Sequence, residues 1–315
     1  MNFESNILIT GGAGFIGSHL CDALITKGHK ITVIDNLILG RKENIAHLIG
    51  NPQFTFIESD LLQLGSLQDI FADGKFAMVY HLAANSDIQK GGKDPVVDYE
   101  LTFQTTFNIL LCMKEYKVNK LFFASTSAIY GETYDRLYEN YGPLQPVSNY
   151  GAGKLASEAF ISAFSANCDI QTWITRFPNV VGERFTHGVI YDFIHKLKKN
   201  PLELEVLGNG KQVKPYLYVK DLVEGILYVC EHSYERFNIY NLGADTRTTV
   251  KEIAEMVIEE MGLQANIHYT GGDRGWVGDV PEFKYDLSKV NALGWKAPHT
   301  SNESVRLAIQ KALDK

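Results

Sequence analysis

The sequence predicts a doubly wound parallel sheet of the Rossmann type with a smaller, interleaved α/β lobe. Strand-like and helix-like segments alternate from the first residues to about residue 178, and repeated βα units of this size form parallel sheets. Beyond that point the alternation weakens, although 237–243 is typical of a strand that returns to the first sheet. We therefore expect one domain over 1–178, joined by the returning strand, and a second lobe formed mainly by 179–315.

The composition indicates an ordinary soluble globular protein. The 315 residues are 45% hydrophobic and 21% charged, with a net charge of −7. A net negative chain suits neither nucleic acid nor an anionic membrane, and no apolar run approaches the ~20 residues that span a bilayer. The start of the chain lacks the pattern of a signal peptide, and the four cysteines show neither metal-ligand nor redox spacing. We expect a cytoplasmic protein with reduced thiols and no metal site.

The first βα unit contains the glycine-rich turn Gly11-Gly-Ala-Gly-Phe-Ile-Gly17, between an apolar strand and a helical pattern. Gly11 allows the chain to turn, Gly14 allows the backbone to approach phosphates, and Gly17 allows the helix to pack closely on the strand. Backbone N–H groups and a positive helix end then face a pyrophosphate. Glycine turns also close ordinary βα units, so the dinucleotide site depends on the next element.

That next element is a second strand, Lys30–Asp35, which ends in an acid 18 residues after Gly17. A carboxylate at this place accepts hydrogen bonds from the adenosine ribose hydroxyls and repels a 2′-phosphate. Asp35 therefore favours NAD over NADP, although the nearby Arg41 and Lys42 keep NADP open.

A third strand over 53–58 precedes Asp60 and Leu61. The Asp60 carboxylate and the adjacent backbone N–H could hold the adenine ring. The same carboxylate could instead cap the helix that starts near Ser66, and the sequence leaves both roles open.

The strand predicted over 76–84 runs into a small-residue turn at Ala83 and Ala84. Small side chains here either allow backbone to pass close to a flat cofactor or allow tight packing beneath a helix. One long helix is predicted over 99–116 from its apolar periodicity, and a fifth strand over 120–127 ends in the hydroxyls of Ser-Thr-Ser.

The helix that opens with Tyr150-Gly-Ala-Gly-Lys154 carries a candidate acid–base pair. Positions i and i+4 share one face of a helix, so the phenol and the ammonium point into the same space. A nearby cation lowers the pKa of a tyrosine, and Thr126 could hydrogen-bond the reacting oxygen. A Tyr-x-x-x-Lys pair alone is more often a surface pair. Because this pair follows the glycine turn and the hydroxyl-rich strand in the sequence, we interpret it as catalytic.

The remaining segments are predicted from shorter patterns. They are a strand over 172–177, a helix over 190–199, a turn at 207–210, a strand over 216–219, a helix over 222–231 and a helix over 250–261.

With these residues in order, the chain resembles the extended short-chain dehydrogenase/reductases, and most of all the NAD-dependent nucleotide-sugar epimerases of the UDP-glucose 4-epimerase type. The matching segments are Gly-Gly-Ala-Gly-Phe-Ile-Gly (11–17), Ile-Asp-Asn-Leu (34–37), His-Leu-Ala-Ala (81–84), Ser-Thr-Ser-Ala-Ile-Tyr-Gly (125–131), Tyr-Gly-Ala-Gly-Lys (150–154), Arg-Phe-Pro-Asn-Val-Val-Gly (176–182), Gly-Asp-Val-Pro (278–281) and Asp-Leu-Ser-Lys (286–289). They extend from Gly11 to about Trp295.

The resemblance implies NAD-dependent epimerisation of a nucleotide-diphosphate sugar, at C4 through a transient 4-keto sugar. Tyr150 would be the base, Lys154 would lower its pKa and hold the nicotinamide ribose, and Thr126 would orient the sugar hydroxyl. The implied NAD contacts are Gly11, Gly14, Phe15, Ile16, Gly17, Asp35, Asn36, Asp60, Leu61, Ala83, Ala84, Tyr150 and Lys154. The implied contacts to a UDP- or other NDP-sugar are Ser127, Asn179, Lys214, Arg274 and Phe283.

Three departures from the family pattern affect these expectations. Lys214-Pro215 stands where many relatives have Arg-Asp, which weakens bidentate phosphate binding. Extra residues follow Arg274, which could instead be a surface charge on a glycine-rich loop. Ser127-Ala128 replaces the Asp-Glu of the sugar 4,6-dehydratases, so dehydration is not expected. Phe283 falls where the resemblance places a residue that varies among the 4-epimerases and limits the room around the sugar C2 substituent. Its bulky ring therefore suggests a hexose or pentose without an N-acetyl group.

Two other functions share this scaffold. An NDP-sugar dehydrogenase or ketoreductase would use the same three residues with net redox, and a non-catalytic NAD- or sugar-nucleotide-binding protein would keep the fold. The family also implies a homodimer through helices corresponding to about 99–116 and 151–166.

Overall fold

The computed structural model describes residues 6–133, 135–275 and 280–314. Gly278 and Asp279 of the predicted Gly-Asp-Val-Pro match lie outside the described residues. The chain divides into two compact units. The first comprises 1–131, 144–176 and 229–240, and the second comprises 132–143, 177–228 and 241–315. The second unit thus takes a short segment from within the region expected to form the first domain.

The first unit is built on a seven-stranded sheet with the order β12-β7-β5-β4-β1-β2-β3, which confirms the predicted Rossmann-type fold. Its strands are β1 (Asn6–Thr10), β2 (Lys30–Asp35), β3 (Phe54–Glu58), β4 (Met78–His81), β5 (Lys120–Thr126), β7 (Gln171–Phe177) and β12 (Phe237–Asn241). The pairs from β3 to β5 are parallel, with Ile9 opposite Val33 on one side and Tyr80 on the other. The strand order reverses at β1, which is where α/β sheets bind ligands.

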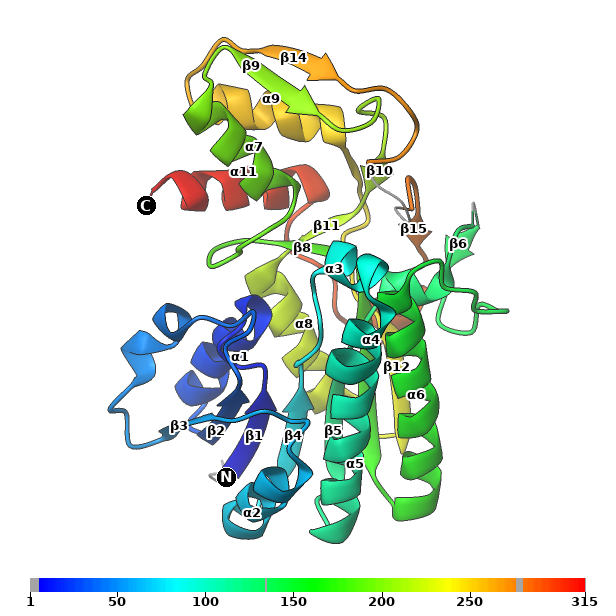
Figure 1. Ribbon diagram of the computed structural model, residues 1–315. Helices are drawn as coiled ribbons and strands as arrows, with labels where there is room; N and C mark the ends of the chain where they lie inside the picture. The colour runs from blue at the N-terminus through cyan, green and yellow to red at the C-terminus, as the bar shows by residue number, and fades with distance from the viewer. Residues whose placement is uncertain (1–5, 134, 276–279, 315) are drawn as a thin grey trace. The chain divides into compact units, whose positions relative to one another are not determined.

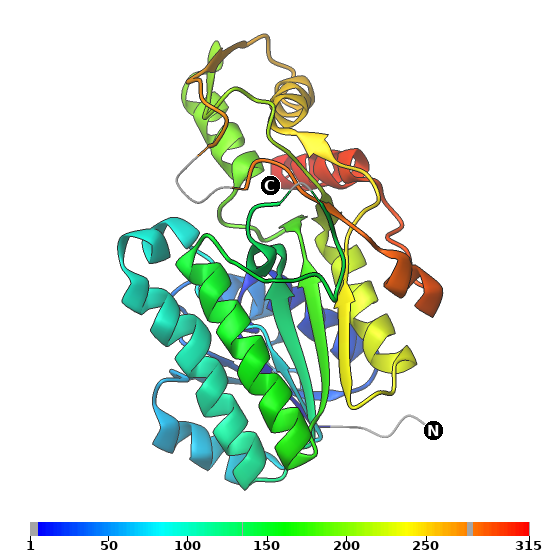
Figure 2. The same ribbon diagram turned by 90° about the vertical axis from the view of Figure 1, so that its right-hand side faces the viewer.

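Helices α1 (Phe15–Thr26), α2 (Leu64–Gly74), α5 (Thr105–Glu115) and α6 (Asn149–Cys168) belong to this unit. Helices α5 and α6 run alongside β5 (Figure 1). Apolar side chains of α2, α5 and α6 share one core cluster with the sheet, and Phe71, Ile109 and Ile161 are almost fully buried in it. Figure 2 shows α5 and α6 lying side by side along the sheet. This packing fixes the start of α6, which carries Tyr150.

The long helix predicted over 99–116 is not regular. After α3 (Ile88–Lys93) and α4 (Pro95–Asp98), the chain forms a π-helical turn over Tyr99–Gln104 before α5 begins. Thr105 and Thr106 donate their hydroxyls to the carbonyls of Leu101 and Thr102, 3.0 and 2.7 Å away. Side-chain donors compete with backbone N–H groups for these carbonyls, which accounts for the widened turn.

The second unit has its own core, formed by α7 (Val189–Lys199), α9 (Val250–Glu260) and α11 (Ser301–Leu313) around β9 (Glu203–Val206) and β14 (Asn266–Tyr269) (Figure 1). Its other elements are β6 (Arg136–Leu137), β8 (Asn179–Val181), β10 (Val213–Lys214), β11 (Tyr216–Tyr218), β13 (Thr248–Thr249), β15 (Lys284–Tyr285) and α10 (Ser288–Leu293). Helix α8 (Val219–His232) begins in this unit and ends in the first.

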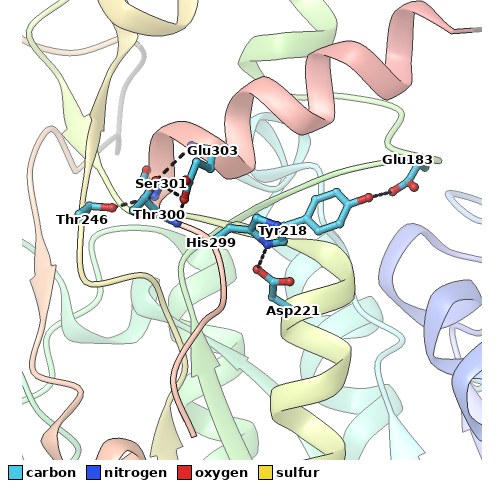
Figure 3. A network of polar contacts seen from close by, with 8 residues as sticks. All are labelled: Glu183, Tyr218, Asp221, Thr246, His299, Thr300, Ser301 and Glu303. Carbon is cyan, nitrogen blue, oxygen red and sulfur yellow. Dashed lines mark hydrogen bonds and ion pairs between the residues drawn. The ribbon is translucent and has the colours of Figure 1, made fainter.

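A polar network fixes the start of α11 (Figure 3). His299 Nδ1 lies 2.9 Å from the buried carboxylate of Asp221, and the His299 ring packs edge-on against Tyr218. The Tyr218 hydroxyl donates to Glu183 at 2.7 Å. Burial opposes the charge of Glu183, but hydrogen bonds from Lys220 and Tyr218 lower its pKa to about 2. The network therefore joins three distant segments of this unit without using the predicted site residues.

Candidate active site

The glycine turn has a backbone conformation that residues with side chains could not adopt without a clash. Gly11 has φ +71°, and a Cβ added there would lie 2.7 Å from the backbone nitrogen of Ala83. A Cβ at Gly17 would lie 2.2 Å from the Gly11 carbonyl oxygen. Helix α1 begins after this turn with no side-chain cap and no acid in its first turn. Its first N–H groups therefore carry no bonded carboxylate and suit an anion such as a pyrophosphate.

Asp35 ends β2 beside this turn and is 8% exposed. One carboxylate oxygen accepts from the Ala13 N–H at 3.0 Å and the other from the Leu37 N–H at 2.9 Å. Burial raises the pKa of Asp35, and these two hydrogen bonds oppose the shift. The carboxylate thus holds the turn as well as standing where a ribose is expected. Asn44, which the sequence did not indicate, closes the other side by donating to the Ala13 carbonyl at 2.9 Å.

Among the remaining predicted cofactor residues, Asp60 and Leu61 follow β3, and Ala83 follows β4. Asp60 accepts from the Leu62 N–H at 2.9 Å, while α2 starts later, with Gln63 as its N-cap residue, so Asp60 does not cap that helix. Leu61 is buried in the core. Ala83, in contrast, packs directly against Gly11 at the carboxyl end of β4.

The other four of these residues have ordinary local contacts. Asn36 accepts from the Ile38 N–H at 3.2 Å, Phe15 packs edge-on against His19, and Ala84 and Ile16 are half-buried.

Thr126 and Tyr150 meet at the ends of β5 and α6. Thr126 Oγ1 accepts from the Ala128 N–H at 3.1 Å, which leaves its hydrogen available for the Tyr150 oxygen. Burial raises the pKa of Tyr150 to about 12; the Thr126 hydrogen bond opposes this, and Asp98 adds to it. Without further positive charge, the phenol is therefore protonated at neutral pH. Helix α6 begins here because Ser148 caps it, accepting from the Gly151 N–H at 3.1 Å.

Lys154, one helical turn after Tyr150 in α6, is 2% exposed. Its ammonium donates to the Ala124 carbonyl at 2.7 Å and stands 4.5 Å from the centre of the Phe123 ring. Burial lowers the pKa of Lys154 to about 7, and the Glu158 carboxylate opposes that shift. The ammonium has one protein hydrogen bond among those described, which leaves donors for a bound group.

The buried His81 was not predicted as a site residue, although it stands in the matched His-Leu-Ala-Ala segment. Its Nε2 lies 2.9 Å from Thr106 Oγ1, whose own hydrogen goes to the Thr102 carbonyl, so Nε2–H is the donor. Its Nδ1 then accepts from the Thr10 hydroxyl at 2.6 Å. Burial and Lys154 lower the pKa of His81 to about 3, so the ring is neutral.

Four of the predicted substrate residues, Asn179, Lys214, Arg274 and Phe283, belong to the second unit, and Ser127 belongs to the first. Asn179 is exposed at the start of β8. Arg274 places one guanidinium nitrogen 2.8 Å from each carboxylate oxygen of Glu132. Phe283 is 7% exposed and packs against Tyr285. Lys214, in β10, is opposite Thr248 of β13.

Within the described part of the chain, no group of three or more His, Cys, Asp or Glu side chains is arranged to hold a metal ion. The helices in the same residues are too short or too polar to cross a bilayer.

Comparisons with known proteins place this site in context. The family model described as "NAD dependent epimerase/dehydratase family" matches residues 7–243. A putative UDP-glucose 4-epimerase from Methanocaldococcus jannaschii is 34% identical over 310 residues, covering 96% of this chain and 97% of that protein. UDP-glucuronic acid decarboxylase 1 from Arabidopsis thaliana is 32% identical over 300 residues, covering 92% of this chain and 66% of that protein.

A solved structure shares the architecture throughout. The crystal structure of UDP-glucose 4-epimerase from Thermus thermophilus in complex with NAD superposes with a TM-score of 0.87. It is 30% identical, and the alignment covers 97% of this chain and 98% of that chain.

Proposed function

Because this chain belongs to the NAD dependent epimerase/dehydratase family, we propose that it is an NAD-dependent epimerase acting at C4 of a nucleotide-diphosphate sugar. The observation that carries the proposal is the meeting of Thr126 and Tyr150, one helical turn before the buried Lys154 in α6, at the sheet edge that also holds the glycine turn. Proton transfer by a positioned phenol and reversible hydride transfer are what this inversion requires.

The residues present fit NAD. The uncapped start of α1 accepts a pyrophosphate, Asp35 favours a ribose with a free 2′-hydroxyl, and the Lys154 ammonium keeps donors for the second ribose. When bound, NAD supplies reversible hydride transfer at the sugar C4. The first unit is thus the cofactor domain, and the second, with Asn179 and Arg274, is the sugar-nucleotide lobe.

Tyr150 removes the proton of the sugar 4-hydroxyl and returns it in the second half of the reaction. Burial holds the phenol protonated, with a pKa of about 12, so a positive charge has to act on it before it can serve as a base. Lys154, buried one helical turn further along α6, is the nearest such charge in the helix. Thr126 donates to the same oxygen and holds the phenolate in line with the sugar.

The proposed substrate is a UDP-sugar. The second unit offers Arg274 for the diphosphate, paired with Glu132 until a stronger anion replaces that carboxylate. The buried, bulky Phe283 favours UDP-glucose and UDP-galactose over their N-acetyl counterparts. Comparable turnover of UDP-GlcNAc and UDP-glucose would contradict this part of the proposal.

We also propose a homodimer in which the exposed aromatic face formed by the π-helical turn Tyr99–Gln104, α5 and α6 packs against a second copy. Tyr99 and Phe160 are 57% and 41% exposed, and Phe103, Phe107 and Phe164 continue the same row of ring contacts. A contiguous aromatic patch of this kind is typical of an interface.

The deciding experiment is proton NMR of the protein with NAD and a panel of UDP-, GDP- and dTDP-sugars, including UDP-glucuronic acid. Absorbance at 340 nm is followed in parallel. We expect the C4 epimer of one UDP-sugar without accumulation of NADH. A sustained change in absorbance at 340 nm would instead identify a dehydrogenase or ketoreductase. Loss of the carboxylate from UDP-glucuronic acid would identify a decarboxylase. NAD binding without turnover would favour a non-catalytic protein.

A further inference from the structure

A buried ion pair contacts residues that flank Thr126 in the candidate active site. Arg176, in β7, is 3% exposed, and Glu158, in α6, is 5% exposed. The guanidinium donates from Nε at 3.0 Å and from Nη2 at 2.6 Å to the two oxygens of the carboxylate. Burial opposes the charge on Arg176, but Glu158 and Tyr130 more than offset this and raise its pKa further. The Arg176 guanidinium is therefore positively charged throughout the physiological pH range.

The pair joins the elements that carry the candidate catalytic residues. Glu158 also accepts from the hydroxyl of Ser125, the residue before Thr126 in β5. Arg176 donates from Nη1 to the Tyr130 hydroxyl at 3.0 Å, and its guanidinium lies 5.1 Å from the centre of that ring. Tyr130 ends the short helical turn 127–130 that Thr126 caps. The ion pair thus fixes both sides of Thr126.

Glu158 also lies one helical turn after Lys154, on the same face of α6. The other groups around Lys154 supply little negative charge. His81, from β4, is neutral, and β5 contributes the Phe123 ring and the Ala124 carbonyl. Asp98, from α4, acts on Tyr150. Glu158 is the charged group that raises the pKa of Lys154 against burial.

We propose that the Arg176–Glu158 pair is a positioning device that sets the geometry around Thr126 and keeps Lys154 positively charged while NAD binds. This rests on the proposed function, which gives Lys154 its contact with the cofactor. Arg176 holds the carboxylate in one orientation, and the carboxylate then serves Lys154 and Ser125 together. Both residues are buried, so they act through their neighbours.

The proposal differs from a purely structural role in its effect on pH dependence. A buried ion pair can often be replaced by apolar residues of similar volume without loss of folding. The double variant Glu158→Met/Arg176→Met should therefore fold, yet it removes the carboxylate that favours the charged form of Lys154. A structural role predicts normal pH behaviour in such a variant, whereas a positioning role predicts a changed one.

The test measures the Kd for NAD⁺ between pH 5.5 and 10 by calorimetry, with thermal melting at each pH to verify folding. In the wild type, affinity should fall as Lys154 loses its proton. In the double variant this fall should move to lower pH by about one unit, so that Kd is about threefold higher midway between the two transitions and about tenfold higher at pH values above both. In Glu158→Gln the fall in NAD⁺ affinity should also move to lower pH. This variant should unfold at a lower temperature than the wild type, because Arg176 is left without a counter-ion.

Two controls separate charge from packing. Arg176→Lys keeps both charges, so the fall in affinity should stay at the wild-type pH. Glu255→Gln removes a carboxylate from an exposed i,i+4 pair with Lys251 and should likewise leave it in place. A folded double variant, or a folded Glu158→Gln, whose affinity falls at the wild-type pH would overturn the inference. If the wild type binds no NAD⁺ at any pH, the proposed function itself fails.

Discussion

Lys154 is the residue at which burial and function conflict most directly. Enclosing its ammonium lowers its pKa from 10.5 to about 7, yet the proposed chemistry requires the charged form. Between pH 7 and 10.5 the unfolded chain binds a proton that the folded chain does not, so stability rises with pH over this window. Below pH 7 Lys154 is protonated in the folded chain as well, and its burial then lowers the free energy of unfolding by the full amount. Above pH 10, Tyr150 acts in the opposite direction, because its pKa is raised to about 12.

Lys154→Met should therefore stabilise the NAD-free protein at pH 6 while it weakens NAD binding. We expect a gain of about 1–4 kcal/mol in the free energy of unfolding, decreasing as the pH approaches 10.5. Urea unfolding at pH 6, 8 and 10 measures the trend. A gain that is the same at all three pH values would contradict the burial argument.

Tyr150→Phe should strongly reduce turnover while the protein still folds and binds NAD. Removing a positioned acid–base group lowers the rate by about 10²- to 10⁴-fold. The NMR assay with the best substrate measures the rate, and Tyr234→Phe is the matched control because that phenol is 79% exposed. Near-normal turnover in Tyr150→Phe would show that another group takes the proton.

At the scale of elements, the structure is decided by how closely backbones approach one another. The strand–turn–helix unit at the start of the chain depends on Gly11 and Gly17, where side chains would meet backbone atoms. The helical segment before the active site depends instead on side-chain donors. Thr105 and Thr106 widen its π turn by bonding carbonyls of the preceding turn.

Gly17→Ala should disrupt the cofactor turn. Its Cβ would lie 2.2 Å from the Gly11 carbonyl oxygen, so α1 has to move away from β1. We expect a loss of about 1–3 kcal/mol in stability and about a 10- to 100-fold higher Kd for NAD. Gly65→Ala in α2 is the control: nothing lies within 4 Å of its added Cβ, and alanine favours helices by about 1 kcal/mol. Equal effects in the two variants would exclude the steric explanation.

At the scale of the whole molecule, the aromatic face formed by the π-helical turn Tyr99–Gln104, α5 and α6 bears on assembly. Phe160 contacts Phe103 and Phe107, with ring centres 5.2 and 5.4 Å apart, and is still 41% exposed. Such a surface is costly to leave in water. The proposed dimer would cover it.

Phe160→Asp should therefore convert the protein to a monomer. A buried carboxylate without a partner at the centre of an interface outweighs the contacts that remain. Light scattering after size-exclusion chromatography gives the mass. Leu202→Asp, at an exposed site (68%) in the second unit, should leave the mass unchanged. A wild-type monomer at micromolar concentration would contradict the proposal.

The sequence by itself determined the order of the βα units, the glycine turn and the choice of catalytic candidates. These features are local: hydrophobic periodicity, glycine spacing and an i,i+4 pair are properties of short segments. The sequence also predicted β2 with its observed bounds, because an apolar run that ends in Asp35 is typical of a buried strand. The strand predicted over 76–84 was too long, since its last residues leave the sheet to pack on Gly11.

Only the tertiary structure decided what surrounds those candidates. Glu158 and Arg176 lie 18 residues apart, and His81 meets Thr10 across 71 residues of sequence. Such partners are chosen by how strands and helices stack, which no local pattern encodes. Whether an acid, a lysine or a histidine is charged depends on burial and on these distant neighbours. The chemical state of the site is therefore a property of the fold, although its residues are named by the sequence.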